Sequence, residues 1–118
     1  METVVNNYGV TDTFCFGPRF LVDGNITNIY DSTSRAQRTF IGTNGDPGDI
    51  WVVVSDGRHN DGKSAGLTYE QCARYLQSKS CTFGVPLDGG GSSTMVWNGK
   101  VLNANKNQRK VVDFVYFR

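Results

Sequence analysis

The sequence predicts an α+β domain with a mixed, largely antiparallel β-sheet, one clear helix over about residues 68–79, and glycine-rich loops. Three observations support this fold class. Most apolar residues fall in short runs separated by turn-forming residues, which is typical of strands. One segment combines a helix start signal with apolar residues at helical spacing. The length of 118 residues leaves room for one hydrophobic core, so residues 1–118 are expected to form a single domain.

The N-terminal strands are predicted to be short. Gly17-Pro18 separates the first two apolar runs, and Asp23-Gly24-Asn25 forms a turn before the third. The segment Asn44-Gly45-Asp46-Pro47-Gly48 has the composition of a turn and ends the fourth. Strands are therefore expected over residues 14–16, 19–22, 26–30 and 38–43.

The run over residues 50–54 is apolar without alternation. A strand that is covered on both faces explains this pattern, so we expect it at the centre of the sheet. Asp56 and Arg58 follow directly, on either side of Gly57. Because ligands often bind where the strands of open sheets end, this charged pair is a candidate for a functional site.

The predicted helix begins at Thr68. Thr68 and Gln71 fit the capping box, in which each side chain accepts a hydrogen bond from a backbone amide that the helix leaves free. Glu70 lies in the first turn, where an acidic side chain is favoured by the helix dipole, and we interpret it as structural. The apolar residues at helical spacing are Cys72, Ala73, Tyr75 and Leu76.

A hairpin and a final strand are predicted near the C-terminus. The apolar runs over residues 94–97 and 100–102 are joined by Asn98-Gly99, and both linking residues tolerate positive φ. This two-residue link is the strongest short hairpin signal. The largely apolar run over residues 111–117 is expected to form the last strand.

Composition excludes several classes of partner. Twelve basic and eleven acidic residues give a formal charge of +1, which offers no electrostatic stripe for nucleic acid. The cluster of Lys106, Arg109 and Lys110 is typical of a solvated surface. No apolar run approaches the roughly 20 residues of a membrane span, and the first residues do not resemble a signal peptide. Localisation stays open, with an extracellular or virion-associated module among the alternatives.

No metal site and no cofactor are predicted. Cys15, Cys72 and Cys81 are odd in number and have no metal-ligand spacing. We expect Cys72 and Cys81 to be buried thiols, with a disulfide between them as the alternative in an oxidising compartment. The polar run from His59 to Gly62 is rich in oxygen but fits no EF-hand, and it is interpreted as a solvated loop.

A glycine-rich loop follows a short strand predicted over residues 85–87. Asp88 is held at the end of that strand, and Gly89-Gly90-Gly91 lacks Cβ atoms, so that a ligand can approach the backbone closely. The hydroxyls of Ser92-Ser93-Thr94 both donate and accept hydrogen bonds. This set suits a sugar that bears a phosphate, but it fits equally well a tight connection in which Asp88 caps backbone amides. No lysine follows the glycines, so a Walker-type nucleotide site is not expected.

Five motifs occur in order along the chain: Arg38-Thr39-Phe40-Ile41-Gly42, Val53-Val54-Ser55-Asp56-Gly57-Arg58, Gly66-Leu67-Thr68, Leu87-Asp88-Gly89-Gly90-Gly91-Ser92-Ser93-Thr94, and Arg109 with Val111. Together they resemble the phosphodiester glycosidase domain family, which includes N-acetylglucosamine-1-phosphodiester α-N-acetylglucosaminidase, the uncovering enzyme. The resemblance spans roughly residues 17–115. Two departures stand out: the N-terminal half is shorter than is usual in the family, and Asp113-Phe114 replaces an expected Asn and small residue.

The resemblance implies hydrolysis of a sugar-1-phosphodiester at the anomeric carbon. That reaction needs a carboxylate for the positive charge at the anomeric centre and cationic partners for the phosphate. Asp88 is the first candidate carboxylate and Asp56 the second. If both act, a separation of about 5 Å favours retention of configuration and about 6.5–9.5 Å favours inversion.

The phosphate is expected to bind arginine, whose guanidinium fork matches its oxygens. Arg38 is the preferred candidate, because a charged residue at the start of an otherwise apolar strand suggests a specific binding partner. The predicted substrate-binding residues are Arg38, Thr39, Arg58, Gly89, Gly90, Gly91, Ser92, Ser93, Thr94 and Arg109.

Two other functions compete with the enzyme. The chain could be a non-catalytic module that binds carbohydrate or glycan phosphate in a surface or virion structure. It could also be an inert subunit of a homo-oligomer or larger assembly that completes the domain. The short N-terminal half favours these alternatives.

Overall fold

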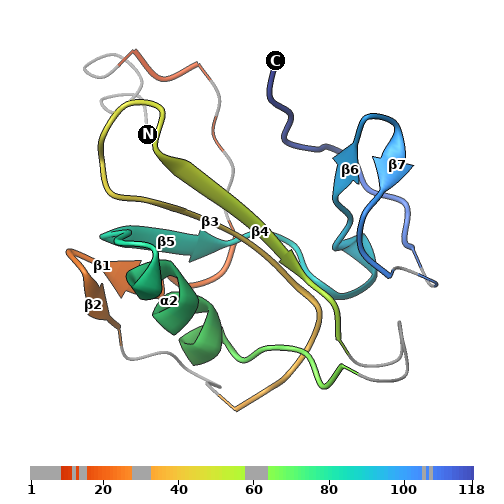
Figure 1. Cartoon of the computed structure of the whole chain (residues 1–118), viewed down its shortest axis with the longest axis horizontal. Coiled ribbons are helices and arrows are strands. Elements are labelled where there is room, and N and C mark those ends of the chain that lie inside the picture. Colours follow the sequence, from red (N-terminus) through yellow and green to blue (C-terminus); the bar gives the residue numbers. More distant parts are fainter. Residues whose placement is uncertain are drawn as a thin grey trace.

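The computed structural model describes residues 9–11, 13, 16–27, 33–57, 64–104, 106 and 108–118. Arg58, the run from His59 to Gly62 and Cys15 lie outside these residues, as do parts of the strands predicted over 14–16 and 26–30. The elements shown in Figure 1 are β1 (Leu21–Val22), β2 (Asn25–Ile26), β3 (Arg38–Thr43), β4 (Ile50–Ser55), α2 (Tyr69–Ser78), β5 (Phe83–Pro86), the 3₁₀ helix η1 (Gly90–Ser92), β6 (Val96–Trp97) and β7 (Lys100–Val101).

The main sheet confirms the predicted α+β class. Five strands are arranged in the order β2-β1-β5-β3-β4, and all of their pairings are antiparallel. β3 covers the predicted residues 38–43, whereas β1 is confined to Leu21–Val22 and β5 begins at Phe83, two residues earlier than predicted. The helix α2 packs on one face of the sheet, against β1, β2, β3 and β5.

The position predicted for β4 is wrong. β4 pairs with β3 and lies at the edge of the sheet that the described residues form, not at its centre. Trp51 and Val53 pack against the core, while Val52 and Val54 alternate onto the other face and are half-buried. The unbroken apolar run therefore indicates that both faces of β4 are partly covered. It does not indicate whether β4 has one neighbouring strand or two.

The helix α2 begins and ends with recognisable caps. The Gln71 amide donates to the Thr68 hydroxyl at 3.1 Å, and the Thr68 amide donates to Gln71 Oε1 at 3.0 Å, which confirms the predicted capping box. At the other end Ser80 adopts φ 61°, and the Cys81 amide donates to the Leu76 carbonyl at 3.0 Å. This is the Schellman arrangement, in which a left-handed residue closes the last turn.

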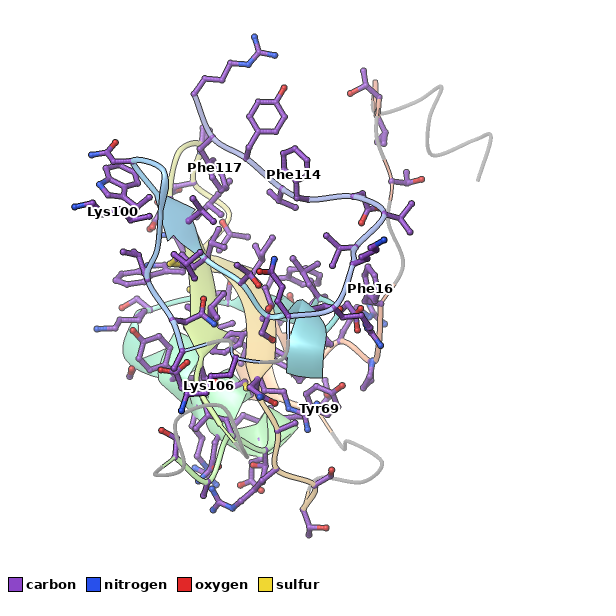
Figure 2. All side chains as sticks on the ribbon, turned by 90° about the vertical axis from the view of Figure 1, so that its right-hand side faces the viewer. Phe16, Tyr69, Lys100, Lys106, Phe114 and Phe117 are labelled. Carbon is purple, nitrogen blue, oxygen red and sulfur yellow. The ribbon has the colours of Figure 1, made fainter. Side chains whose placement is uncertain are left out.

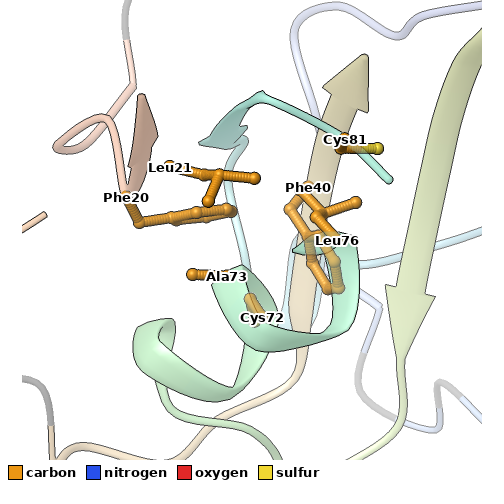
Figure 3. Packing of buried hydrophobic residues seen from close by; sticks show 7 residues of the cluster. All are labelled: Phe20, Leu21, Phe40, Cys72, Ala73, Leu76 and Cys81. Carbon is orange, nitrogen blue, oxygen red and sulfur yellow. The ribbon is translucent and has the colours of Figure 1, made fainter. Parts of the chain in front are cut away.

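The core lies between α2 and the sheet (Figure 3). It consists of Phe20, Leu21, Phe40, Cys72, Ala73, Leu76 and Cys81. Cys72 and Cys81 are buried free thiols, as predicted, and are not bonded to each other. Burial raises the pKa of Cys72 to about 12, although the charge of Arg38 lowers it in part. Gly42 lets Leu76 pack directly on β3, because a Cβ atom there would lie 2.6 Å from Leu76 Cδ1.

The predicted hairpin is confirmed, but the predicted last strand is wrong. β6 and β7 pair antiparallel, and Asn98 and Gly99 both have positive φ. Residues 111–117 form no strand, and Phe114 is 80% exposed. In Figure 2, Phe114 and Phe117 project from the C-terminal segment. An apolar run rich in β-branched and aromatic residues favours a strand, but pairing also needs a neighbouring strand, and none of the described strands pairs with this segment.

Candidate active site at the glycine-rich loop

The glycine-rich loop runs from the end of β5 past the start of β3. The Leu87 amide donates to the Thr39 carbonyl at 2.8 Å, and the Gly90 amide donates to the Gln37 carbonyl at 3.0 Å. These two bonds fix the backbone on both sides of Asp88. Asp88 is thus held at the end of a strand, as the sequence predicted.

Two positions of the loop favour glycine for different structural reasons. A Cβ atom on Gly89 would lie 2.9 Å from the Gln37 carbonyl oxygen, so this position must be glycine for the loop to pack against the chain before β3. Gly90 has φ +59°, which disfavours other residues, and a Cβ atom there would meet nothing within 4 Å. Gly90 is therefore where a ligand could approach the backbone.

Much of the loop's backbone is hydrogen-bonded within the protein. The Gly89 amide donates to Asp88 Oδ1 at 2.9 Å, and the Ser92 and Ser93 amides donate to the carbonyls of Gly89 and Gly90, each at 3.1 Å. With the Gly90 amide bonded to Gln37, four of the loop amides are engaged in this way. Side chains rather than backbone amides are consequently the main groups that face a ligand.

Three predicted site residues meet on this loop. Arg109 Nη2 forms an ion pair with Asp88 Oδ2, and it also donates to Ser92 Oγ at 2.8 Å. Arg109 Nε donates to the same hydroxyl at 3.0 Å. The side chains of Arg109 and Asp88 are 62% and 46% exposed. The loop thus presents a carboxylate, a guanidinium and a hydroxyl together at the surface.

The surroundings of Asp88 favour its ionised form. Partial burial raises the pKa of the carboxyl group, but the hydrogen bonds from Ser92, Arg109 and the Gly89 amide, together with the charge of Arg109, outweigh this effect. The pKa of Asp88 lies below its ordinary value. At neutral pH Asp88 is a carboxylate and holds no proton to donate.

Within the part of the chain that the structure describes, the Arg38 guanidinium contacts other groups than the Asp88–Ser92–Arg109 cluster. Its guanidinium donates to the carbonyls of Leu67 at 3.1 Å and Ser34 at 2.8 Å, and its Cζ lies 4.0 Å from the centre of the Tyr69 ring. These contacts tie the start of β3 to the segment before α2. They give the structural reason for a charged residue at the start of an apolar strand.

The Asp56 side chain also forms a hydrogen bond with the backbone. Its Oδ1 accepts a hydrogen bond from the Ala104 amide at 2.8 Å, which joins the end of β4 to the segment that follows β7. Among the other predicted site residues, Ser93 is fully buried, and Thr39 and Thr94 are half-buried. Arg58 lies outside the described residues.

The sequence interpretation missed Asn103. Its side-chain oxygen accepts from the Met95 amide at 2.8 Å, and its side-chain nitrogen donates to the Ser93 carbonyl at 2.8 Å. Asn103 thereby fixes the backbone at the C-terminal end of the glycine-rich loop. The only hint in the sequence is that the polar run after the hairpin contains three residues, Asn103, Asn105 and Asn107, of a type that favours backbone hydrogen bonds.

Neither a metal cluster nor a membrane helix is found among the described residues. No three of their His, Cys, Asp or Glu side chains are grouped to hold a metal ion. In the same part of the chain, no helix has the length and apolar character to cross a membrane.

Comparison with known proteins places the chain in a family. The phosphodiester glycosidase family model matches residues 2–118, so the chain belongs to this family. No curated protein matches it significantly.

Two solved structures have a similar fold. A hypothetical protein from Synechocystis is 26% identical with a TM-score of 0.59, and the match covers 75% of this chain and 17% of that one. The catalytic domain of zebrafish N-acetylglucosamine-1-phosphodiester α-N-acetylglucosaminidase, auto-inhibited by its pro-peptide, is 22% identical with a TM-score of 0.60. That match covers 75% of this chain and 33% of the zebrafish chain. The chain therefore spans a third or less of the length of either structure.

Proposed function

We propose that this chain carries the site of a hydrolase that cleaves a sugar-1-phosphodiester, of the N-acetylglucosamine-1-phosphodiester kind, at the anomeric carbon. The observation that carries the proposal is the cluster of Asp88, Ser92 and Arg109 on the glycine-rich loop. Membership of the phosphodiester glycosidase family and the fold shared with the zebrafish enzyme, which is named for this substrate, support it.

Asp88 is the group proposed to act at the sugar. The bond from the anomeric carbon to the phosphate oxygen breaks through a state with positive charge on the sugar. An ionised carboxylate can stabilise that charge or attack the carbon, and the lowered pKa keeps Asp88 ionised at neutral pH. The same lowered pKa argues against Asp88 as the proton donor.

Arg109 and Ser92 are proposed to bind the phosphate. The departing phosphomonoester carries its negative charge well, because its second pKa is about 6, so it needs charge stabilisation more than a proton. A guanidinium with further donors can exchange its contact with Asp88 for one with phosphate oxygens. One carboxylate and one guanidinium then stabilise the two developing charges, and the released phosphomonoester dianion can take up the proton of the attacking water. Arg38, Arg58 and Asp56 stay predictions for the same site.

The experiment uses the p-nitrophenyl diester of N-acetylglucosamine-1-phosphate in water enriched in ¹⁸O. Cleavage at the anomeric carbon adds the water oxygen to that carbon and releases p-nitrophenyl phosphate, which an added phosphatase converts to coloured nitrophenolate. The expected result is ¹⁸O in the free sugar and none in the p-nitrophenyl phosphate before phosphatase is added. Label in the phosphate at that stage would instead mean attack at phosphorus and would contradict the proposal.

The second candidate is a module that binds glycan phosphate without cleaving it. The observation that favours it is the ion pair, because Arg109 already occupies the carboxylate that the reaction requires. Calorimetric titration with the same diester separates the two functions. Binding without product identifies the module, product identifies the enzyme, and the absence of both contradicts both.

A further inference from the structure

We propose that Asn103 and Asp56 are positioning residues, which hold the segment after β7 along the glycine-rich loop so that Arg109 reaches Asp88. The proposal rests on the proposed function, since it assigns these residues to the same site. It also gives Asp56 a role different from that of a second catalytic carboxylate.

The segment is fastened to the loop at several points. Asn103 bonds the Ser93 carbonyl and the Met95 amide, each at 2.8 Å, and the Arg109 amide donates to the Gly91 carbonyl at 2.8 Å. Asn103 therefore fixes the exit of the loop, and the backbone of Arg109 fixes its middle. Together these bonds fix the backbone position from which the Arg109 side chain extends.

Asp56 connects this arrangement to the sheet. It follows β4 directly, and its Oδ1 accepts from the Ala104 amide, next to Asn103, at 2.8 Å. Asp56 and Asn103 are half-buried, whereas Arg109 is 62% exposed. The exposed guanidinium is thus carried by a backbone that half-buried polar side chains anchor.

Positioning matters because arginine has many rotamers. An exposed ion pair does not by itself hold two long side chains in one geometry. A displacement of about 1 Å at a reacting group can lower turnover about 100-fold. Anchoring the backbone at Asn103 and Ala104 reduces the volume that the Arg109 guanidinium explores, and so keeps it within reach of Asp88 and Ser92.

Two substitutions at Asp56 separate positioning from catalysis. Asp56→Ala removes the acceptor of the Ala104 amide, and we expect turnover to fall about 10- to 100-fold. Asp56→Asn keeps a side-chain oxygen for this amide but cannot act as a base, and we expect it to recover at least about tenfold over Asp56→Ala. If Asp56 were a general base, turnover would fall about 100- to 10,000-fold in both variants. Equal losses in Asp56→Asn and Asp56→Ala would overturn the proposal.

A substrate-free measurement tests the same idea independently. In Asn103→Ala we expect faster hydrogen exchange of the Met95 amide and loss of the protected Arg109 Nε–H signal in NMR spectra, because both depend on the fastened loop. The matched control is Asn44→Ala, which also removes two side-chain bonds, to the Asp46 amide and to Asp49, but in the β3–β4 turn. That turn lies at the other end of β3 from the site.

The outcomes separate the two proposals. Asn44→Ala should leave the Arg109 signal unchanged. An unchanged Arg109 signal in Asn103→Ala would overturn the positioning role. If Asn103→Ala fails to fold, Asn103→Asp replaces it, since it keeps the acceptor for Met95 and loses the donor to Ser93. Should the parent chain show no turnover, the proposed function fails while the NMR comparison still decides the positioning role.

Discussion

The region up to β5 and the region from Asp88 onward are held together by different forces. In the first, α2 and the sheet enclose a core of seven buried apolar residues. In the second, none of the described side chains joins that core, and most large apolar residues are exposed. Hydrogen bonds and the Asp88–Arg109 ion pair connect it instead. The part of the molecule that the core stabilises and the part that carries the candidate site are therefore different parts.

Removing a core ring should have the largest effect on stability. Phe40→Ala deletes a fully buried ring that packs edge-on against Phe20 at 6.0 Å, and we expect the free energy of unfolding to fall by about 3–5 kcal/mol. Phe114→Ala is the matched control, because its ring is 80% exposed, and should change that free energy by less than about 0.5 kcal/mol. Urea denaturation of both variants measures the difference. Similar losses would break the division into two regions.

Alkaline pH should weaken the packed region through Cys72. Its pKa is about 12 in the folded protein and 9.0 ordinarily, so the folded state keeps a proton that the unfolded state has lost between these values. The free energy of unfolding therefore falls by roughly 1.4 kcal/mol for each pH unit in this window. Cys72→Ala should remove this part of the slope. Identical slopes in the parent and the variant would contradict the burial of the thiol.

The caps of α2 contribute less. Thr68→Ala removes the acceptor of the Gln71 amide, and the free energy of unfolding should fall by about 1 kcal/mol. Ser80→Gly relieves a left-handed conformation at the other end and should raise it by about 0.5–1 kcal/mol. Thermal unfolding of both variants measures these changes. Opposite signs are expected, and a loss in both would mean that the helix does not end as described.

The ion pair should contribute least to stability. Because both side chains are about half-exposed, Arg109→Ala should cost less than about 1 kcal/mol at neutral pH. The pKa of Asp88 is lowered in the folded state, so this contribution is present above the ordinary pKa and is lost as the pH falls through the lowered one. Unfolding measured from pH 7 to pH 2 should show the parent and the variant converging in acid. A constant difference would contradict the pairing.

In both regions the sequence predicted local features better than distant pairings, for a physical reason. Helix caps and the Asn98-Gly99 turn depend on neighbours in the sequence, so the capping box at Thr68 and the hairpin were confirmed. Strand order depends on distant pairings, so β4 was misplaced and residues 111–117 were wrongly expected to pair.

The contacts of the site were only partly predictable. Family motifs singled out Asp88, Ser92 and Arg109, which the structure brings together. They gave no indication that Arg38 would donate to the carbonyls of Ser34 and Leu67. Nor could they reveal Asn103, because its two bonds exist only once the hairpin has brought it beside Ser93.

The turnover of Asp88→Asn on the p-nitrophenyl diester tests whether the reaction takes place at the glycine-rich loop. The control Asp46→Asn makes the same chemical change at an exposed position in the β3–β4 turn. We predict that Asp88→Asn loses at least about 100-fold in turnover while its unfolding midpoint stays close to that of the parent, and that Asp46→Asn keeps its activity. Turnover by Asp88→Asn within a few-fold of the parent would contradict the placement of the reaction at this loop.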